Sequence, residues 1–152
     1  MFLINFYTFM LDDYIETRLN DQITWHSKKS QFNQKKYKQI KTLVILCAAF
    51  VPLLAGINAA GGCYLLLKPA IGGLGVIIVV CESILSLYKY DELWLQYRVT
   101  AETLEREKIL FLNHIGNYAD EASALENLIK TTENILSQQN INWINTTVQK
   151  DK

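Results

Sequence analysis

Residues 42–88 read TLVILCAAFVPLLAGINAAGGCYLLLKPAIGGLGVIIVVCESILSLY, and this stretch decides the fold. It contains only two charged residues, Lys68 and Glu82, and Lys68 separates two apolar segments. A helix needs about 20 consecutive apolar residues to cross the hydrocarbon core of a bilayer, and both segments are long enough. The sequence therefore predicts a membrane hairpin with spans at residues 42–60 and 69–88.

The charges outside this stretch are unevenly distributed, although 15 basic and 15 acidic side chains cancel overall. A series of six lysines with no acid among them precedes the first span: Lys28, Lys29, Lys35, Lys36, Lys38 and Lys41. Lysines beside a span mark its cytoplasmic side. We therefore expect a two-span protein of the cell inner membrane with both termini in the cytoplasm. The same lysines attract anionic lipid headgroups, and we favour this interpretation over a nucleotide site.

Apolar residues recur at helical spacing on both sides of the spans, and almost no strand pattern is present. The pattern predicts three further helices, at residues 12–41, 89–115 and 120–138. The first is expected to continue unbroken into the membrane, and no helix breaker follows the second span. Gly61-Gly62 marks the turn between the spans, and residues 140–142 are expected to end the last helix. The prediction is an all-α fold with a two-helix transmembrane hairpin whose long helices extend into a cytosolic helical bundle, as a single domain over residues 1–152.

Two strings on either side of the spans carry a family resemblance. They are Tyr14-x-x-x-Arg18-Leu19-x-Asp21-Gln22-Ile23-x-Trp25-x-x-Lys28-Lys29-Ser30 and Leu87-Tyr88-Lys89-Tyr90-x-Glu92-x-Trp94-x-x-Tyr97-Arg98-x-x-Ala101-Glu102-x-Leu104-x-x-Glu107-Lys108. With two spans between them, the chain resembles the SLATT family of bacterial two-transmembrane proteins over residues 14–143. The most specific part is Trp-x-x-Tyr-Arg-x-x-Ala-Glu, residues 94–102.

The SLATT resemblance implies an all-helical hairpin and bundle with a pore-forming or membrane-disrupting role in bacterial conflict and antiviral systems. It implies no catalytic residues. It also implies a sensor or nucleotide-signalling partner protein, because many members of the family are fused to such a domain or encoded beside one.

Glu82 is the candidate pore residue, because an ionisable group within a span usually faces a partner, a cavity or water. The spacing places four residues on one face of the second span: Gly75, Val79, Glu82 and Ser86. In a homo-oligomer this face would form a ring of acids above a ring of hydroxyls, as in cation-selective pores. The alternative places Glu82 near the inner interface of the membrane, where it pairs locally or meets water.

Arg98 and Glu102 lie one helical turn apart, beside two aromatic residues. Because Arg suits bidentate pairing, we expect a buried polar clamp that joins this helix to the first one through Asp21 or Gln22. The residues of this structural clamp are Asp21, Gln22, Trp25, Trp94, Tyr97, Arg98 and Glu102. The alternative is a solvated face beside an aromatic core, and neither arrangement performs chemistry.

Two functions therefore remain: an oligomeric, pore-forming membrane effector, or a non-conducting two-span anchor and oligomerisation scaffold for a partner protein. An enzyme is not expected, because the chain has no Walker loop, dinucleotide fingerprint or nucleophile elbow. No metal or other cofactor is expected, since the histidines stand alone and the three cysteines lack metal-ligand spacing. The expected partners are the lipid bilayer and further copies of the chain, and nucleic acid is not among them.

Overall fold

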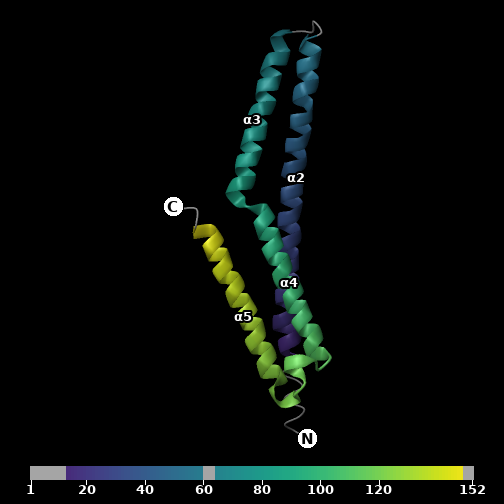
Figure 1. Cartoon of the computed structure of the whole chain (residues 1–152), viewed down its shortest axis with the longest axis vertical. Helices are drawn as coiled ribbons and strands as arrows, with labels where there is room; N and C mark the ends of the chain where they lie inside the picture. Colours follow the sequence, from purple (N-terminus) through teal and green to yellow (C-terminus); the bar gives the residue numbers. More distant parts are fainter. Residues whose placement is uncertain (1–12, 60–63, 149–152) are drawn as a thin grey trace. The chain divides into compact units, whose positions relative to one another are not determined.

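The computed structural model describes residues 13–59 and 64–148 (Figure 1). Within these ranges every regular element is a helix, so the all-α prediction is confirmed. The elements are a π-helical turn η1 (Tyr14–Leu19), α2 (Asn20–Ala59), α3 (Tyr64–Tyr88), α4 (Tyr90–Leu112), a 3-10 turn η2 (Gly116–Tyr118) and α5 (Glu121–Val148).

The chain divides into two compact units. We call Met1–Ser30 together with Leu95–Lys152 the bundle unit, and Gln31–Trp94 the hairpin unit. Helix α2 belongs to both units and runs through them as one uninterrupted helix, which confirms that the first predicted helix continues into the first span. The assignment of residues 1–152 to a single domain stays a prediction.

An apolar core holds the bundle unit together. Leu19 of η1, Leu104 of α4 and Leu128 of α5 are each 0% exposed, so all three elements contribute to it. Full burial of a leucine side chain contributes about 1.5–3 kcal/mol relative to an exposed one. The whole core cluster consists of Ile15, Leu19, Leu104, Phe111, Tyr118, Ala124, Leu128 and Leu136.

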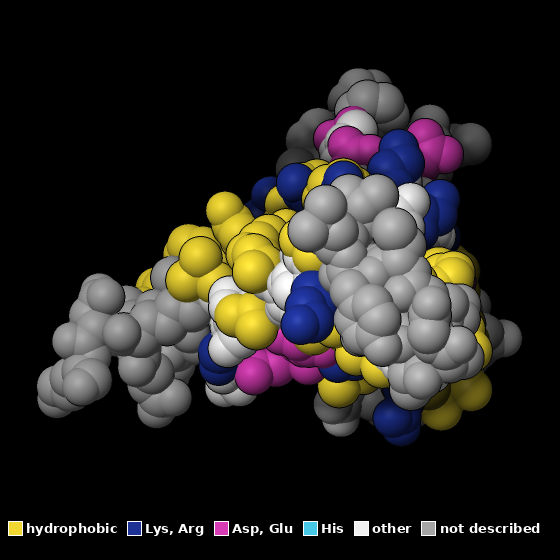
Figure 2. Space-filling model, turned by 90° about the horizontal axis from the view of Figure 1, so that it is seen from above, with side chains coloured by type: hydrophobic (Ala, Val, Ile, Leu, Met, Phe, Trp, Pro, Cys, Tyr) yellow, Lys and Arg dark blue, Asp and Glu magenta, His cyan; other side chains and the backbone are white. Residues whose placement is uncertain are grey.

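The hairpin unit has a thin buried seam and a large apolar surface. Helix α3 runs alongside the later part of α2 (Figure 1), and the seam contains Val44, Cys47 and Leu85, each 7% exposed. Most of the other apolar side chains point outward. Figure 2, a view from above, shows hydrophobic side chains at the surface together with basic and acidic ones.

Within the described part of the chain, two helical stretches are long and apolar enough to cross a membrane, Tyr14–Gly56 and Lys68–Leu112. Only 11% and 6% of their most apolar windows are buried inside the protein. The core helix of a soluble protein would bury most of such a window, because apolar surface left in water is costly. Length, composition and exposure therefore all favour two membrane spans.

The junction between α3 and α4 differs from the prediction of an unbroken helix. Lys89 interrupts the helix with a φ of 47°, in the left-handed region that non-glycine residues rarely adopt. Side chains two positions apart in a helix do not face each other, yet the rings of Tyr88 and Tyr90 stack with centroids 5.5 Å apart. The interruption therefore brings the two tyrosine rings together across Lys89. Lys89 itself forms an ion pair with Glu92 at 3.1 Å.

Two helix ends also differ from the prediction. Helix α3 begins at Tyr64, five residues before the predicted start at Pro69, so the proline lies inside the helix. Helix α5 continues through residues 140–142 to Val148, and the predicted end at Gln138 is wrong. Asparagine disfavours a helix by only a few tenths of a kcal/mol relative to an average residue. That preference is too weak to stop a helix whose Gln139 side chain meets His26 across the bundle unit.

Candidate functional site in the hairpin unit

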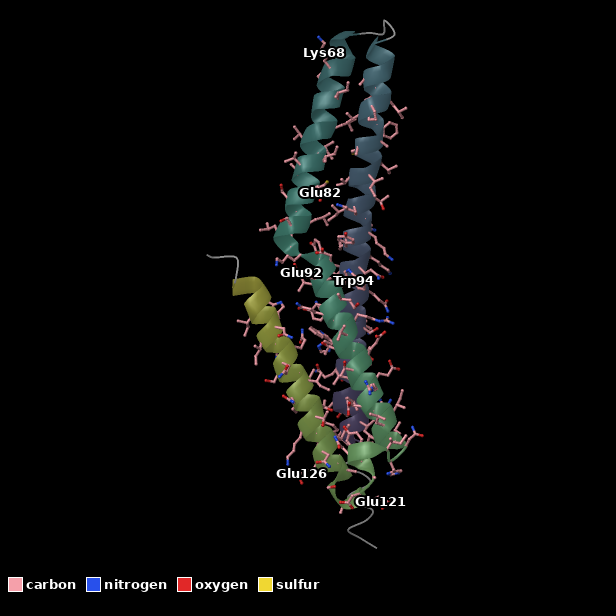
Figure 3. All side chains as sticks on the ribbon, in the orientation of Figure 1. Lys68, Glu82, Glu92, Trp94, Glu121 and Glu126 are labelled. Atoms are coloured by element: carbon pink, nitrogen blue, oxygen red, sulfur yellow. The ribbon has the colours of Figure 1, made fainter. Side chains whose placement is uncertain are left out.

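An ion pair joins the two helices of the hairpin unit. Lys41 of α2 donates a hydrogen bond from Nζ to Oε1 of Glu82 on α3, with a separation of 2.7 Å. In Figure 3, Glu82 points from α3 toward α2. The side chains are 41% and 43% exposed, and the buried residues Val44 and Leu85 follow them by about one turn on their own helices. The pair therefore lies at the edge of the buried seam and is open on one side.

The position of this pair follows from the symmetry of a helical hairpin. The predicted turn at Gly61-Gly62 lies outside the described residues. Lys41 lies 18 residues before the end of α2 at Ala59, and Glu82 lies 18 residues after the start of α3 at Tyr64. Two antiparallel helices rise by the same 1.5 Å per residue, so residues equally far from the turn reach the same level. Local spacing along the second span does not identify Lys41 as the partner of Glu82, because the two residues are 41 positions apart in the sequence. Counting outward from the turn is the signal that identifies it.

The predicted pore face of α3 is divided in the single chain. Gly75 and Glu82 are half-buried, whereas Val79 is 65% exposed and Ser86 is also exposed. The reason is geometric: the half-buried side of α3 is centred on residues 74, 78, 81 and 85, so the predicted stripe overlaps only its edge. Gly75 has free space beside it, because an added Cβ would meet nothing within 4 Å.

An aromatic cluster joins α2 to α4 within the bundle unit. The Trp25 ring lies edge-on to Tyr97, with centroids 5.6 Å apart, and edge-on to His26 at 4.8 Å. His26 is buried, and its Nδ1 lies 2.8 Å from the carbonyl oxygen of Gln22. Because a carbonyl only accepts, Nδ1 carries the proton and donates. Two predicted clamp residues, Trp25 and Tyr97, do come together here, and His26 is the member that the sequence analysis missed.

The charged residues of the predicted clamp have a different arrangement. Arg98 pairs with Glu102 one turn along α4, and the two side chains are 56% and 58% exposed. Asp21 is also exposed, so Arg98 and Glu102 form a solvated pair on one helix instead of a buried link to the first helix. Of the two remaining members, Gln22 is half-buried beside His26 in the bundle unit, and Trp94 is half-buried in the hairpin unit. Arg98 and Glu102 stay in water because keeping two charges hydrated costs less free energy than burying them.

The six lysines before the first span are in different environments. Five of them are exposed: Lys28, Lys29, Lys35, Lys36 and Lys38. The ammonium groups of Lys29 and Lys36 lie over the rings of Trp25 and Phe32, at 5.7 Å and 5.8 Å, which is cation–π distance. The sixth, Lys41, is half-buried in its pair with Glu82. Headgroup binding by these lysines stays a prediction.

A groove of about 730 Å³ lies in the bundle unit. It is lined by the first part of α2 and by residues 133–140 of α5. It contains two cations, Arg18 and Lys28, and two carboxylates, Asp21 and Glu133. Arg18 pairs with Glu133 at 3.0 Å. Because the four charges cancel, the groove has no excess positive charge with which to attract a phosphate. Among the described residues, no three His, Cys, Asp or Glu side chains are grouped to hold a metal ion.

These features define a class: all-α proteins with two helices long and apolar enough to cross a membrane and a separate helical bundle unit. Residues 21–125 match the family model described as protein of unknown function (DUF4231), and the chain belongs to that family. No curated protein and no solved structure matches the chain.

Proposed function

We propose that the protein is an oligomeric membrane effector that forms a pore or channel, in the kind of bacterial conflict or antiviral system that the SLATT resemblance implies. The observation that carries this proposal is Glu82, the one acid within a 47-residue apolar stretch, on a helix that exposes apolar side chains around it. Carboxylates inside a span are costly and mark ion pathways.

Oligomerisation follows from how little one hairpin can enclose. A single pair of helices has no interior in which an ion could travel, and its buried seam contains only a few side chains. The outer surface of α3 exposes Val76, Val79 and Val80. In a ring of copies these residues would pack against the next hairpin, and Gly75 would leave room for its close approach.

The proposed setting is the inner membrane of a bacterial cell, with both termini in the cytoplasm and the lysine series at the headgroups. The bundle unit would assemble the copies or receive the signal of a sensor or nucleotide-making partner. Dissipating an ion gradient requires no catalytic group, so the protein would act without being an enzyme.

The direct test is ion flux through purified protein in liposomes, together with its mass in detergent. We expect a closed oligomer and a protein-dependent flux of potassium that collapses an imposed membrane potential. A monomer that passes no ions would contradict the proposal.

Glu82→Gln tests the acid ring. This change removes the charge with little change in volume, so we expect lower conductance and a weaker preference for cations over anions, measured as a shift in reversal potential. Glu92→Gln is the matched control, because Glu92 lies outside the apolar stretch and pairs with Lys89. Equal conductance and selectivity in wild type and Glu82→Gln would count against the acid ring.

A second function, a non-conducting anchor and scaffold, is favoured by one observation. Trp25 and Phe32 are exposed aromatic residues on α2, outside the apolar stretch, where lipid would not cover them. Large exposed aromatics are typical of docking surfaces. This function predicts liposomes that pass no ions, and activity that survives replacement of both spans by unrelated ones.

A further inference from the structure

We propose that Lys41 controls the charge selectivity of the ion path by pairing with Glu82, and that the conducting state forms when this pair opens. The inference rests on the proposed pore function and concerns the regulation of the same site. The structure then represents the closed state, in which the acid is neutralised within its own hairpin.

The geometry of the pair supports this role. At 2.7 Å, the Nζ–Oε1 contact is a charge-assisted hydrogen bond, the stronger kind of polar contact. Both side chains nevertheless remain close to half exposed. The carboxylate is therefore held at a defined place while it stays reachable from outside the seam.

The electrostatic consequence is that a ring of intact pairs carries no net charge. A permeating cation would meet an ammonium beside every carboxylate, so attraction and repulsion would largely cancel. Removal of the ammonium leaves a ring of carboxylates, which attracts cations and repels anions. These interactions are stronger beside apolar helices than in bulk water, because the effective dielectric constant is lower there.

The opening step requires only a side-chain movement. Lysine carries its charge on a flexible four-carbon stem, so Nζ can leave Glu82 while the backbone of α2 stays in place. The apolar seam of Val44, Cys47 and Leu85 would keep the helices packed during this exchange. A lipid phosphate at the membrane surface is a suitable new partner for the released ammonium.

Lys41→Met in liposomes tests the proposal. Methionine keeps most of the stem and removes the charge, so we expect a severalfold rise in potassium flux and a reversal potential closer to that of a pure cation conductor. Lys130→Met is the control, because Lys130 is an exposed lysine on α5 that pairs with Glu126 and lies outside the lysine series. It should behave as wild type. The double charge swap Lys41→Glu with Glu82→Lys restores a pair and should return the flux toward the wild-type level.

The possible failures can be told apart. If Lys41→Met has the flux and selectivity of wild type, the inference is overturned and the pore function stands. If neither wild type nor any variant passes ions, the pore function is overturned and the inference with it. A leak in Lys41→Met without preference between potassium and chloride would indicate a disrupted hairpin, and this outcome also overturns the inference.

Discussion

At the scale of single residues, Tyr118 is the largest fully buried side chain among the described residues. Its side chain is 1% exposed and lies edge-on to the Phe111 ring, with centroids 5.7 Å apart. The hydroxyl donates a hydrogen bond to Oε2 of Glu107 at 2.6 Å. Burial, and then the hydrogen bond to Glu107, raise the pKa of Tyr118 to about 12. The folded protein therefore favours the neutral phenol.

This shift predicts a loss of stability at alkaline pH. The folded-state pKa of Tyr118 lies above the unfolded value of about 10. The contribution of its neutral hydroxyl to the free energy of unfolding is therefore complete below about pH 10 and disappears as the pH rises toward 12. Tyr118→Phe should cost about 1 kcal/mol at neutral pH because Glu107 loses its donor, and the alkaline decline should become shallower. Denaturant unfolding in detergent, followed by circular dichroism at several pH values, measures both. The exposed Tyr88, changed to Phe, is the control, and an identical alkaline decline in both variants would refute the assignment.

At the scale of elements, α5 is attached to the bundle unit by one narrow stripe. Ala124, Leu128, Thr132 and Leu136 are buried at spacings of four residues along the helix. The other faces of α5 are mostly exposed or half-buried. The attachment of this helix therefore depends on very few side chains.

Leu128→Ala tests this attachment. Leu128 is fully buried, so removing its side-chain atoms should destabilise the protein by about 2–5 kcal/mol. The next residue, Ile129, points away from the core, and Ile129→Ala should cost less than about 1 kcal/mol. Denaturant unfolding in detergent compares the two variants with wild type. Similar losses would mean that the stripe is not the main attachment.

The elements also show where the sequence analysis succeeded and why it failed elsewhere. Long apolar stretches and helical periodicity predicted each main helix, because both signals accumulate over many residues. The interruption at Lys89 depends on a local backbone conformation that no glycine or proline announces. Helix α5 continues past Gln138, and Gln139 contacts His26, a residue distant in sequence. The helix preference of asparagine is too weak to end the helix there.

The sequence predicted some residues of the candidate site but not how they pair. Glu82 is conspicuous as a lone acid in apolar sequence, but its partner Lys41 is identified only by counting residues outward from the turn of the hairpin. For Arg98 and Glu102, residue type suggested a buried clamp, and the structure shows an exposed pair. Burial depends on the rotation of α4 about its axis, which spacing alone does not give.

At the scale of the whole molecule, the proposed topology requires both ends of the chain on the cytoplasmic side. Single cysteines at exposed positions test it after Cys47, Cys63 and Cys81 are replaced by alanine. In intact cells, a membrane-impermeant thiol reagent should label Lys68→Cys and should label Glu16→Cys and Glu121→Cys only after permeabilisation. Labelling of the two terminal positions on opposite sides would overturn the two-span topology.

The uninterrupted course of α2 restricts how the gene can change in length. Each residue added to a helix turns everything beyond it by about 100°. One inserted residue near Gln39 would therefore turn Asn33 away from the side of α2 that it shares with Val44, and both residues are buried within the hairpin unit. An insertion of seven residues would nearly restore the phase, since seven is close to two full turns. Evolutionary length variation in α2 should thus come in steps close to whole turns, such as about seven or about eleven residues, whereas the connection between α4 and α5 is free of this constraint.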